Sequence, residues 1–431
     1  MYKHRENKSN QMRHIVIITF LLASNLVIYA QEKSKFGIKF SGLIKNDFFY
    51  DTRQTISARE GHFLLWPSNE RIDEYGNDIN AKANFNFLAI QSRIKAAFSG
   101  PDAFGAKTSG VIEADFFGQL NPNINLLRLR HAYIKLNWTN LEVLTGQYWN
   151  PLFVTDCYPG TISFNTGTPF QSFARNPQIR VSYNISGFKV IAAALAQRDY
   201  STWGIGGPSS SYLRNAIVPD MHLQLHYKSK NDKAGLKYVL GGGLAFKSIV
   251  PRLESEMGPA NDIYKINEKV HGLTAMGFAK VTIKPITIKF QARYGENISD
   301  ILAISGFAVK EINNTTTGEL SYTPLKSISY WGEVYTNGKI QFGIFGGYFK
   351  NLGTKDPMSH ADNKVYGLGT NINSLFRISP RVSITTGKIR LALELEYTVA
   401  AYGNNFNLNY IPDNTTKIAN LRTLIALCYF F

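Results

Sequence analysis

Charged side chains alternate with apolar ones along three neighbouring segments, and they are the residues best placed to do chemistry. They are Arg93, Lys95, Glu113, Asp115, Arg128 and Arg130. Within each segment the charges are two residues apart, so an extended chain places them on one face. If symmetric hairpins join the segments, Arg93 lies opposite Glu113, and Asp115 lies opposite Arg130. We call this set the charge ladder.

The charge ladder has two interpretations. Its members could satisfy one another across neighbouring strands and thereby stiffen a wall. They could also create a transverse field that orients charged solutes, as rings of charged side chains do in pores. The same alternation places further charges on the interior face of later segments, at Arg180, Arg293, Arg390, Glu394 and Glu396.

Basic residues outnumber acidic ones on the faces expected to line an interior. Besides the ladder, the basic positions are Lys39, Lys45, Arg180, Lys189, Lys228, Lys237, Lys280, Lys289, Arg293, Arg390 and Arg422. The acidic positions are Asp47, Glu113, Asp115, Glu333, Glu394 and Glu396. A surplus of one sign in a narrow interior favours the opposite ion. The pattern therefore predicts anion preference, which depends on the ladder arginines more than on the loop residues Arg53 and Arg59.

An apolar loop follows the fifth candidate strand. Residues 150–177 contain two charges, Asp156 and Arg175, whereas nine charges lie between Asp51 and Asp78 in the first long loop. The aromatic residues of the apolar loop are Phe153, Tyr158, Phe164, Phe170 and Phe173. Such a segment is unfavourable in water. It either folds inward and narrows an interior passage, or packs over a neighbouring protomer.

Enzymatic and metal-binding chemistry finds little support. His222 and His226 have the spacing of a helical zinc site, but on a strand they lie roughly 13 Å apart, too far to share a metal. Glu394 and Glu396 could form a catalytic carboxylate pair, but a charged interior wall accounts for them better. The sequence has no G-x-S-x-G, H-E-x-x-H or phosphate-binding glycine loop. We predict no catalytic residues, no metal and no cofactor.

Period-two alternation extends from Phe36 to the end of the chain and predicts an all-β protein. The expected strands are 36–51, 82–98, 107–118, 127–137, 141–149, 177–185, 187–198, 220–229, 235–247, 269–283, 286–296, 318–335, 339–350, 364–379, 387–402 and 417–431. Short connections alternate with long ones, as in outer-membrane barrels that have short periplasmic turns and long extracellular loops. We expect a transmembrane antiparallel barrel of about sixteen strands.

The first thirty residues have the pattern of a cleaved export signal. A basic stretch precedes the apolar run 15–28, which is too short to span a bilayer as a helix of about 20 residues. Residues 31–431 are then one barrel domain. Removing four Lys or Arg and one Glu lowers the net charge from +16 to 16 − 3 = +13. We expect outer-membrane lipid and lipopolysaccharide, and no nucleic acid, as partners of this basic chain.

The final strand ends at a terminal phenylalanine. Leu421, Ile425, Leu427, Tyr429 and Phe431 lie on one face, which is an aggregation hazard unless this strand pairs with the first. Here the chain resembles bacterial outer-membrane proteins in general. That resemblance implies that the barrel-assembly machinery recognises Phe431 and that the protein is integral to a Gram-negative outer membrane.

A family resemblance lies between Leu127 and Pro151, where Leu127–Leu136 is followed by the sequence Leu-Thr-Gly-Gln-Tyr-Trp-Asn-Pro. This region resembles the DcaP-like trimeric porins and, more distantly, the phosphate-selective porins. About 25 residues are covered, and the rest of the match is architectural. The resemblance implies a sixteen-stranded homotrimer that passes small, often anionic solutes.

We therefore expect a porin that lets small hydrophilic, anionic solutes diffuse passively through a lumen narrowed by the apolar loop. One alternative is a barrel enzyme such as a lipase or protease, which needs a catalytic constellation near the rim. A second is a structural or adhesion barrel with an occluded lumen. A third, a channel for hydrophobic compounds, usually carries an N-terminal hatch, and only Gln31 to Lys35 precede the first strand.

Overall fold

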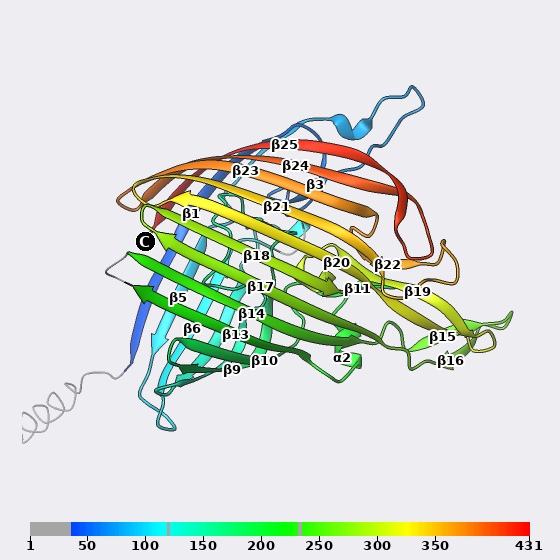
Figure 1. Cartoon of the computed structure of the whole chain (residues 1–431), viewed down its shortest axis with the longest axis horizontal. Helices are drawn as coiled ribbons and strands as arrows, with labels where there is room; N and C mark the ends of the chain where they lie inside the picture. Colours follow the sequence, from blue (N-terminus) through cyan, green and yellow to red (C-terminus); the bar gives the residue numbers. More distant parts are fainter. Residues whose placement is uncertain (1–35, 119–120, 232–234) are drawn as a thin grey trace, which may run out of the picture.

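The protein forms a single closed antiparallel barrel in a computed structural model that describes residues 36–118, 121–231 and 235–431 (Figure 1). The predicted export signal lies outside the described residues. Among those residues, no helix is both long enough and apolar enough to span a bilayer. Sixteen strand positions make up the wall, and the second position is divided between β4 and β5.

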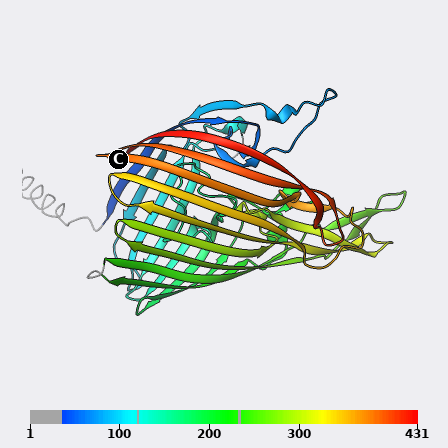
Figure 2. The same cartoon turned by 45° about the horizontal axis from the view of Figure 1, so that its top comes forward.

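The wall strands follow one another around the barrel in sequence order (Figure 2). They are β1 (Gly37–Asp51), β4 (Asn84–Leu88) with β5 (Arg93–Ser99), β6 (Lys107–Asp115), β7 (Arg128–Asn137), β8 (Leu141–Trp149), β9 (Arg175–Ile185), β10 (Phe188–Leu195), β13 (Asp220–Asn231), β14 (Leu236–Ile249), β17 (Val270–Ile283), β18 (Ile286–Glu296), β20 (Glu319–Thr336), β21 (Ile340–Thr354), β23 (Ile372–Thr386), β24 (Ile389–Phe406) and β25 (Pro412–Phe430). β1 pairs with β25 on one side and with β4 and β5 on the other, which closes the barrel. The predicted all-β barrel is confirmed.

Shorter elements lie in the connections; some of them extend the barrel at one end, and others fold into its interior. They are β2 (Thr55–Ala58), β3 (Phe63–Pro67), η1 (Ile79–Ala81), η2 (Asn121–Asn123), β11 (Trp203–Gly204), β12 (Gly207–Pro208), α2 (Ser211–Asn215), β15 (Glu254–Met257), β16 (Asp262–Lys265), η3 (Ser299–Ile301), β19 (Ser305–Asn314) and β22 (Val365–Leu368). The hairpin β15–β16 extends from one end of the barrel, and the C-terminus lies at the other (Figure 1).

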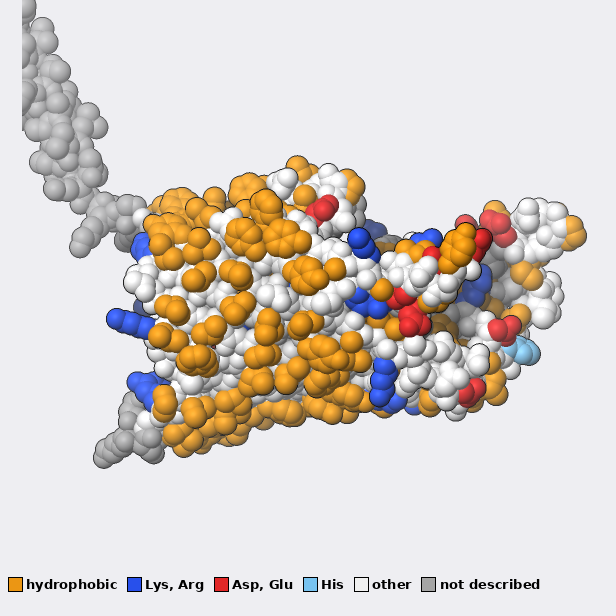
Figure 3. All heavy atoms as spheres, turned by 90° about the horizontal axis from the view of Figure 1, so that it is seen from above, with side chains coloured by type: hydrophobic (Ala, Val, Ile, Leu, Met, Phe, Trp, Pro, Cys, Tyr) orange, Lys and Arg blue, Asp and Glu red, His pale blue; other side chains and the backbone are white. Residues whose placement is uncertain are grey.

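Alternation along each strand separates an apolar outer face from a polar inner face. On β18, Ile286, Ile288 and Phe290 are exposed, whereas Thr287 and Lys289 between them are buried. On the face seen in Figure 3, apolar side chains are spread over the barrel wall, and most visible charges lie towards its ends. This apolar belt is the surface that an outer-membrane barrel presents to lipid. On β25 the predicted face, Leu421, Ile425, Leu427, Tyr429 and Phe431, is exposed as expected.

The fourteenth wall strand begins and ends later in the chain than the alternation predicts. The expected strand covered 364–379, whereas β23 extends from Ile372 to Thr386. Pro380 lies inside β23 and donates no ladder hydrogen bond, which makes the sequence resemble a strand end. The register with β24 continues across it, since Ile378 pairs with Tyr397 and Arg381 pairs with Glu394.

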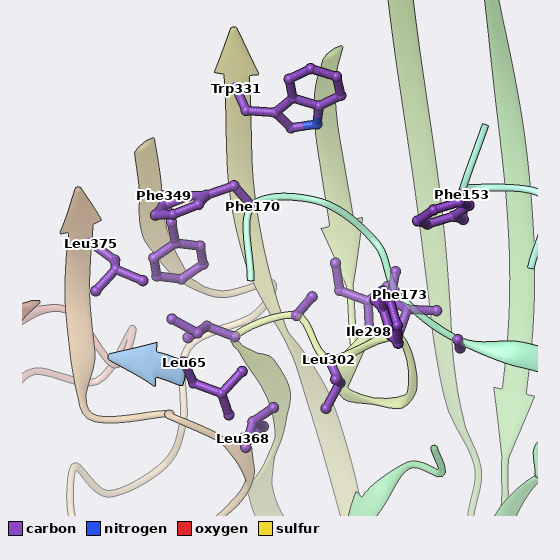
Figure 4. Packing of buried hydrophobic residues seen from close by; sticks show 14 of the residues in the cluster. Leu65, Phe153, Phe170, Phe173, Ile298, Leu302, Trp331, Phe349, Leu368 and Leu375 are labelled. Carbon is purple, nitrogen blue, oxygen red and sulfur yellow. The ribbon is translucent and has the colours of Figure 1, made fainter. Parts of the chain in front are cut away.

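Four loops at the end with the long connections determine how the interior is filled. We name them L1 (52–83), L3 (150–174), L4 (196–219) and L6 (297–318). Buried apolar residues from L1, L3 and L6 pack against inward-facing residues of the wall (Figure 4). Leu65 comes from L1, Phe170 and Phe173 from L3, and Ile298 and Leu302 from L6. A substantial part of the hydrophobic core therefore lies inside the barrel.

L1 also folds into the barrel, although its nine charges make it look more suited to water than L3. Although L1 is rich in charges, all five residues of its strand β3 are buried. The apolar run from Phe63 to Pro67 is the sequence signal for this strand, but a count of charges over the whole loop hides it. Tyr402 of the wall donates a hydrogen bond of 2.7 Å to the Pro67 carbonyl, which fixes the end of the run.

Candidate functional site

The charge ladder forms, but in a different register from the one expected. Arg93 lies opposite Asp115, and Lys95 lies opposite Glu113. Each β5 residue therefore faces a β6 residue two positions later than the symmetric hairpin predicts. On the next strand Glu113 pairs with His131 and Ala114 pairs with Leu129. Arg130 between them is therefore the extra residue of a β-bulge, which re-aims its side chain.

Arg130 links both carboxylates of the ladder. Its Nε donates to Glu113 at 2.7 Å and its Nη1 donates to Asp115 at 2.7 Å. Arg93 lies diagonally 3.5 Å from Glu113, and Arg128 lies 3.1 Å from Asp115. The ion pairing of the ladder thus combines the directly opposite pair of Arg128 and Asp115 with diagonal contacts of Arg93 and Arg130.

L4 and L1 add charged residues next to the ladder, Asp199 and Arg59. Asp199 of L4 contacts Arg175 at 2.6 Å and Arg128 at 3.4 Å. Burial alone would raise the pKa of Asp199, but Arg175, Arg128 and Arg59 together hold it well below its usual range. Asp199 therefore carries a negative charge at neutral pH.

Five guanidinium groups share three carboxylates in this region, which we call the arginine cluster. Its members are Arg59, Arg93, Arg128, Arg130, Arg175, Glu113, Asp115 and Asp199. The formal charge is 5 − 3 = +2. Arg59 of L1 is buried, donates to the Tyr200 hydroxyl at 2.6 Å and acts on the charge of Asp199, so this loop residue lies next to the ladder.

A cavity of about 320 Å³ lies between L3 and part of the arginine cluster. Arg93, Glu113 and Arg130 line it from the wall, while Phe153 and Tyr158 line it from L3. The Phe153 ring stacks on Trp149 at a centroid distance of 3.9 Å and on Tyr158 at 5.2 Å. The cavity therefore has one cationic side and one aromatic side.

The other side of L3 is bonded to the opposite wall. Glu333 of β20 accepts from the Gly160 backbone N–H at 2.7 Å, and Glu394 of β24 accepts from the Ile162 N–H. Lys45 of β1 donates to the Ile162 carbonyl at 2.7 Å, and Lys289 donates to the Tyr158 carbonyl at 2.9 Å. L3 is thus attached to β18, β20 and β24, and also to β1, which pairs with the ladder strand β5.

The second half of L3 is attached in the same way. Arg293 donates to Ser172 Oγ at 2.6 Å, and Trp331 donates to Gln171 Oε1 at 2.8 Å. Asn165 donates to Glu396 at 2.7 Å. Glu394 and Glu396, which the sequence placed on the inner wall, both contact L3. Together these bonds hold L3 against β18, β20 and β24.

Arg377 is a residue that sequence reasoning missed. It is fully buried on β23 and donates to the Leu65 carbonyl of L1 at 2.7 Å and to the Thr168 carbonyl of L3 at 2.8 Å. The predicted strand ends at residue 379, so Arg377 lies near its end, next to an expected connection. Continuing the alternation through Pro380 would have placed both Arg377 and Arg381 on the inner face.

The other predicted residues have various environments. Arg180 donates to the Trp149 carbonyl at 2.6 Å, and Arg390 donates to Thr385 at 3.2 Å. Phe170 lies against Phe345 of the wall, with ring centroids 6.2 Å apart, instead of lining the cavity. Lys95 of the ladder is half-buried opposite Glu113. Among the described residues, no group of three or more His, Cys, Asp or Glu is placed to hold a metal.

His62 of L1 forms a buried pair with the wall. Its Nε2 lies 2.6 Å from Asp47, which also contacts Lys45 at 3.0 Å. Burial lowers the pKa of His62 below its usual 6.5, since the Asp47 contact is outweighed by desolvation, with Lys45 and Arg422 acting in the same direction. His62 is therefore neutral in the folded state.

This lowered pKa predicts an acid-sensitive L1. Because the unfolded state binds the proton more tightly, stability is complete above pH 6.5 and declines as the pH falls below it. We expect L1 to become more susceptible to protease as the pH is lowered. Cleavage of the wild type and of His62→Asn at matched pH values measures this effect. An equal pH slope in both proteins would contradict the assignment to His62.

Comparison with known proteins shows similarity in structure. No family model matches the sequence, and no curated protein matches it. The outer-membrane channel DcaP of Acinetobacter baumannii superposes with a TM-score of 0.67 at 16% identity, covering 93% of this chain and 99% of that one. The anion-selective porin from Comamonas acidovorans gives 0.52 at 10% identity, covering 92% and 100%. OmpT of Vibrio cholerae gives 0.51 at 11%, covering 93% and 99%.

These similarities establish the fold over nearly the whole chain. The predicted resemblance to DcaP-like porins is confirmed as a structural one, and the sixteen-stranded outer-membrane barrel is shared. Together with the apolar belt, this places the barrel in an outer membrane.

Proposed function

We propose that the protein is a passive, non-enzymatic diffusion channel that prefers small hydrophilic anions. The observation that carries this proposal is the cavity between L3 and the arginine cluster. Arg93, Arg130 and Glu113 line its wall side with a formal charge of 2 − 1 = +1. L3 is bonded to several strands of the wall, and we infer that it narrows the passage next to this cationic side. A cationic constriction with low-dielectric walls concentrates anions.

The proposal includes an environment for the channel. We propose that residues 1–30 direct export, that 31–431 form the barrel domain, and that Phe431 is recognised during assembly. Lipopolysaccharide is the expected neighbour of basic residues at the outer rim. We also propose a homotrimer. One of the structures with this fold is described as the trimer form of the Vibrio cholerae protein OmpT.

An occluded structural barrel is the second candidate function. It is favoured by the apolar cluster that L1, L3 and L6 form inside the barrel, because such packing excludes water. The two candidates differ in a single property, the passage of ions.

Planar-bilayer recording of the purified protein separates the two candidates. We expect stepwise conductance and, across a KCl gradient, a reversal potential that favours chloride. The preference is expected to increase at low salt, because salt screens the fixed charges: the Debye length is about 10 Å at 0.1 M and increases on dilution. An absence of conductance supports the occluded barrel, and cation selectivity overturns the proposed anion preference.

A further inference from the structure

A second cavity, of about 650 Å³, lies in the lumen next to the short turn that joins β9 to β10. Lys189, His226 and Asn184 line it from one row across three strands, because Lys189 pairs with Asn184 on β9 and with His226 on β13. Lys228 and Asn140 also line it. Ammonium, imidazole and amide groups therefore converge on one space.

The charges around this cavity are less well paired than those of the arginine cluster. Lys135 lies 3.1 Å from Glu142 and Lys228 lies 3.7 Å from Asp156 of L3. Among the described residues, neither Lys189 nor the nearby Arg180 has a carboxylate within ion-pair distance. By contrast, each ladder arginine lies within 3.5 Å of a carboxylate.

Asp156 is placed to compete with a bound anion. It is about half exposed on L3, lines the cavity and contacts the exposed ammonium group of Lys228. An exposed ion pair of this kind is weak, typically below about 1 kcal/mol. A multivalent anion that contacts both lysines can therefore displace Asp156 from Lys228.

We propose that this cavity is a binding site for small multivalent oxyanions, with Lys189 and Lys228 as the charged ligands. We call it the vestibule site. An oxyanion suits it because several oxygen atoms can accept hydrogen bonds at once from the ammonium and amide donors. The proposal deepens the proposed function, since it rests on anions as the permeating solutes and adds a second place where they bind.

Isothermal titration of inorganic phosphate into the detergent-solubilised full-length protein tests the vestibule site. We expect Lys189→Gln to weaken phosphate binding about fivefold, because one of two charge-assisted contacts is lost. Asp156→Asn is expected to strengthen binding about threefold, since the competing carboxylate is removed. Lys237→Gln is the matched control, because Lys237 is an exposed lysine of the adjacent strand β14 that does not line the cavity.

Two results would overturn the vestibule site. One is Lys189→Gln binding phosphate as the Lys237→Gln control does, and the other is Asp156→Asn binding more weakly than the wild type. Binding in detergent does not require conduction, so the outcome is separate from that of the channel proposal. A protein that conducts but shows no effect of Lys189→Gln retains the channel and loses the site. A non-conducting protein with the expected binding changes loses the channel and retains the site.

Discussion

Replacing Arg93, Arg128 and Arg130 together with Gln is expected to reverse the ion selectivity of the channel. The arginine cluster then changes from 5 − 3 = +2 to 2 − 3 = −1, because its three carboxylates stay in place. In the proposed channel a cationic cluster beside the passage repels cations, and an anionic one attracts them. We expect the ratio of chloride to potassium permeability to fall by about tenfold at low salt.

The reversal potential across a KCl gradient measures this change. Arg53→Gln is the matched control, since Arg53 lies in L1, pairs with Asp78 at 3.0 Å and is not part of the cluster. Arg59 is unsuitable as a control because it belongs to the cluster. Equal selectivity in the triple variant and in Arg53→Gln would show that other residues govern permeation.

Stability limits the triple variant, and a milder variant avoids this difficulty. Asp115 is fully buried, and leaving a buried charge without its partner costs about 3–5 kcal/mol. Arg93 is the most exposed of the three arginines, with 21% of its side chain accessible. Arg93→Gln alone lowers the cluster charge by one and leaves Asp115 paired with Arg128 and Arg130. It should shift selectivity in the same direction by a smaller amount.

The wall could be predicted because alternation is a local property of the sequence. A strand whose one face meets lipid and whose other face meets a polar interior has a period of two, and its register is strongly specified. For this reason the strands and the inward face of residues such as Lys45 and Glu333 could be inferred from one sequence. The β-bulge at Arg130 could not, because its presence depends on how two strands twist against each other.

The interior contacts were harder to predict because they join residues distant in the sequence. Arg377 is 312 positions from Leu65 and 209 from Thr168, yet it donates to both carbonyls. The sequence indicates that L3 is too apolar for water, but it does not indicate which wall L3 will contact. That choice depends on the summed hydrogen bonds to β18, β20 and β24, which no single segment encodes.

Replacing Glu333 with Ala is expected to release the part of L3 that contains Cys157. Glu333 is fully buried and accepts from the Gly160 N–H at 2.7 Å, while Lys289 at 2.9 Å and Arg381 at 2.6 Å neutralise its charge. Without Glu333 the two cations face each other unpaired, and the Gly160 N–H loses its acceptor. Removing one partner of a buried ion pair costs about 3–5 kcal/mol. This cost exceeds the free energy that the few hydrogen bonds of this segment contribute, about 1 kcal/mol each.

Cys157 provides the measurement, because its thiol reports whether L3 is attached to the wall. In the folded protein Cys157 Sγ lies 3.4 Å from the Ala279 carbonyl, and burial raises the pKa of the thiol from 9.0 to about 11. Release into water restores the ordinary pKa, so the reactive thiolate fraction increases by about a hundredfold. In a Cys428→Ser background, which leaves Cys157 as the one cysteine of the chain, we expect Glu333→Ala to accelerate alkylation by at least this factor.

Glu333→Gln distinguishes the role of charge from the role of the hydrogen bond. The Gln side chain still offers an oxygen to the Gly160 N–H, so L3 should stay attached more often and alkylation should be slower than in Glu333→Ala. Both variants remove one negative charge from the inner wall, and both should therefore increase the preference for chloride. If Cys157 reacts at the wild-type rate in Glu333→Ala, the remaining contacts of Lys45, Glu394 and Arg293 are sufficient to hold L3 in place.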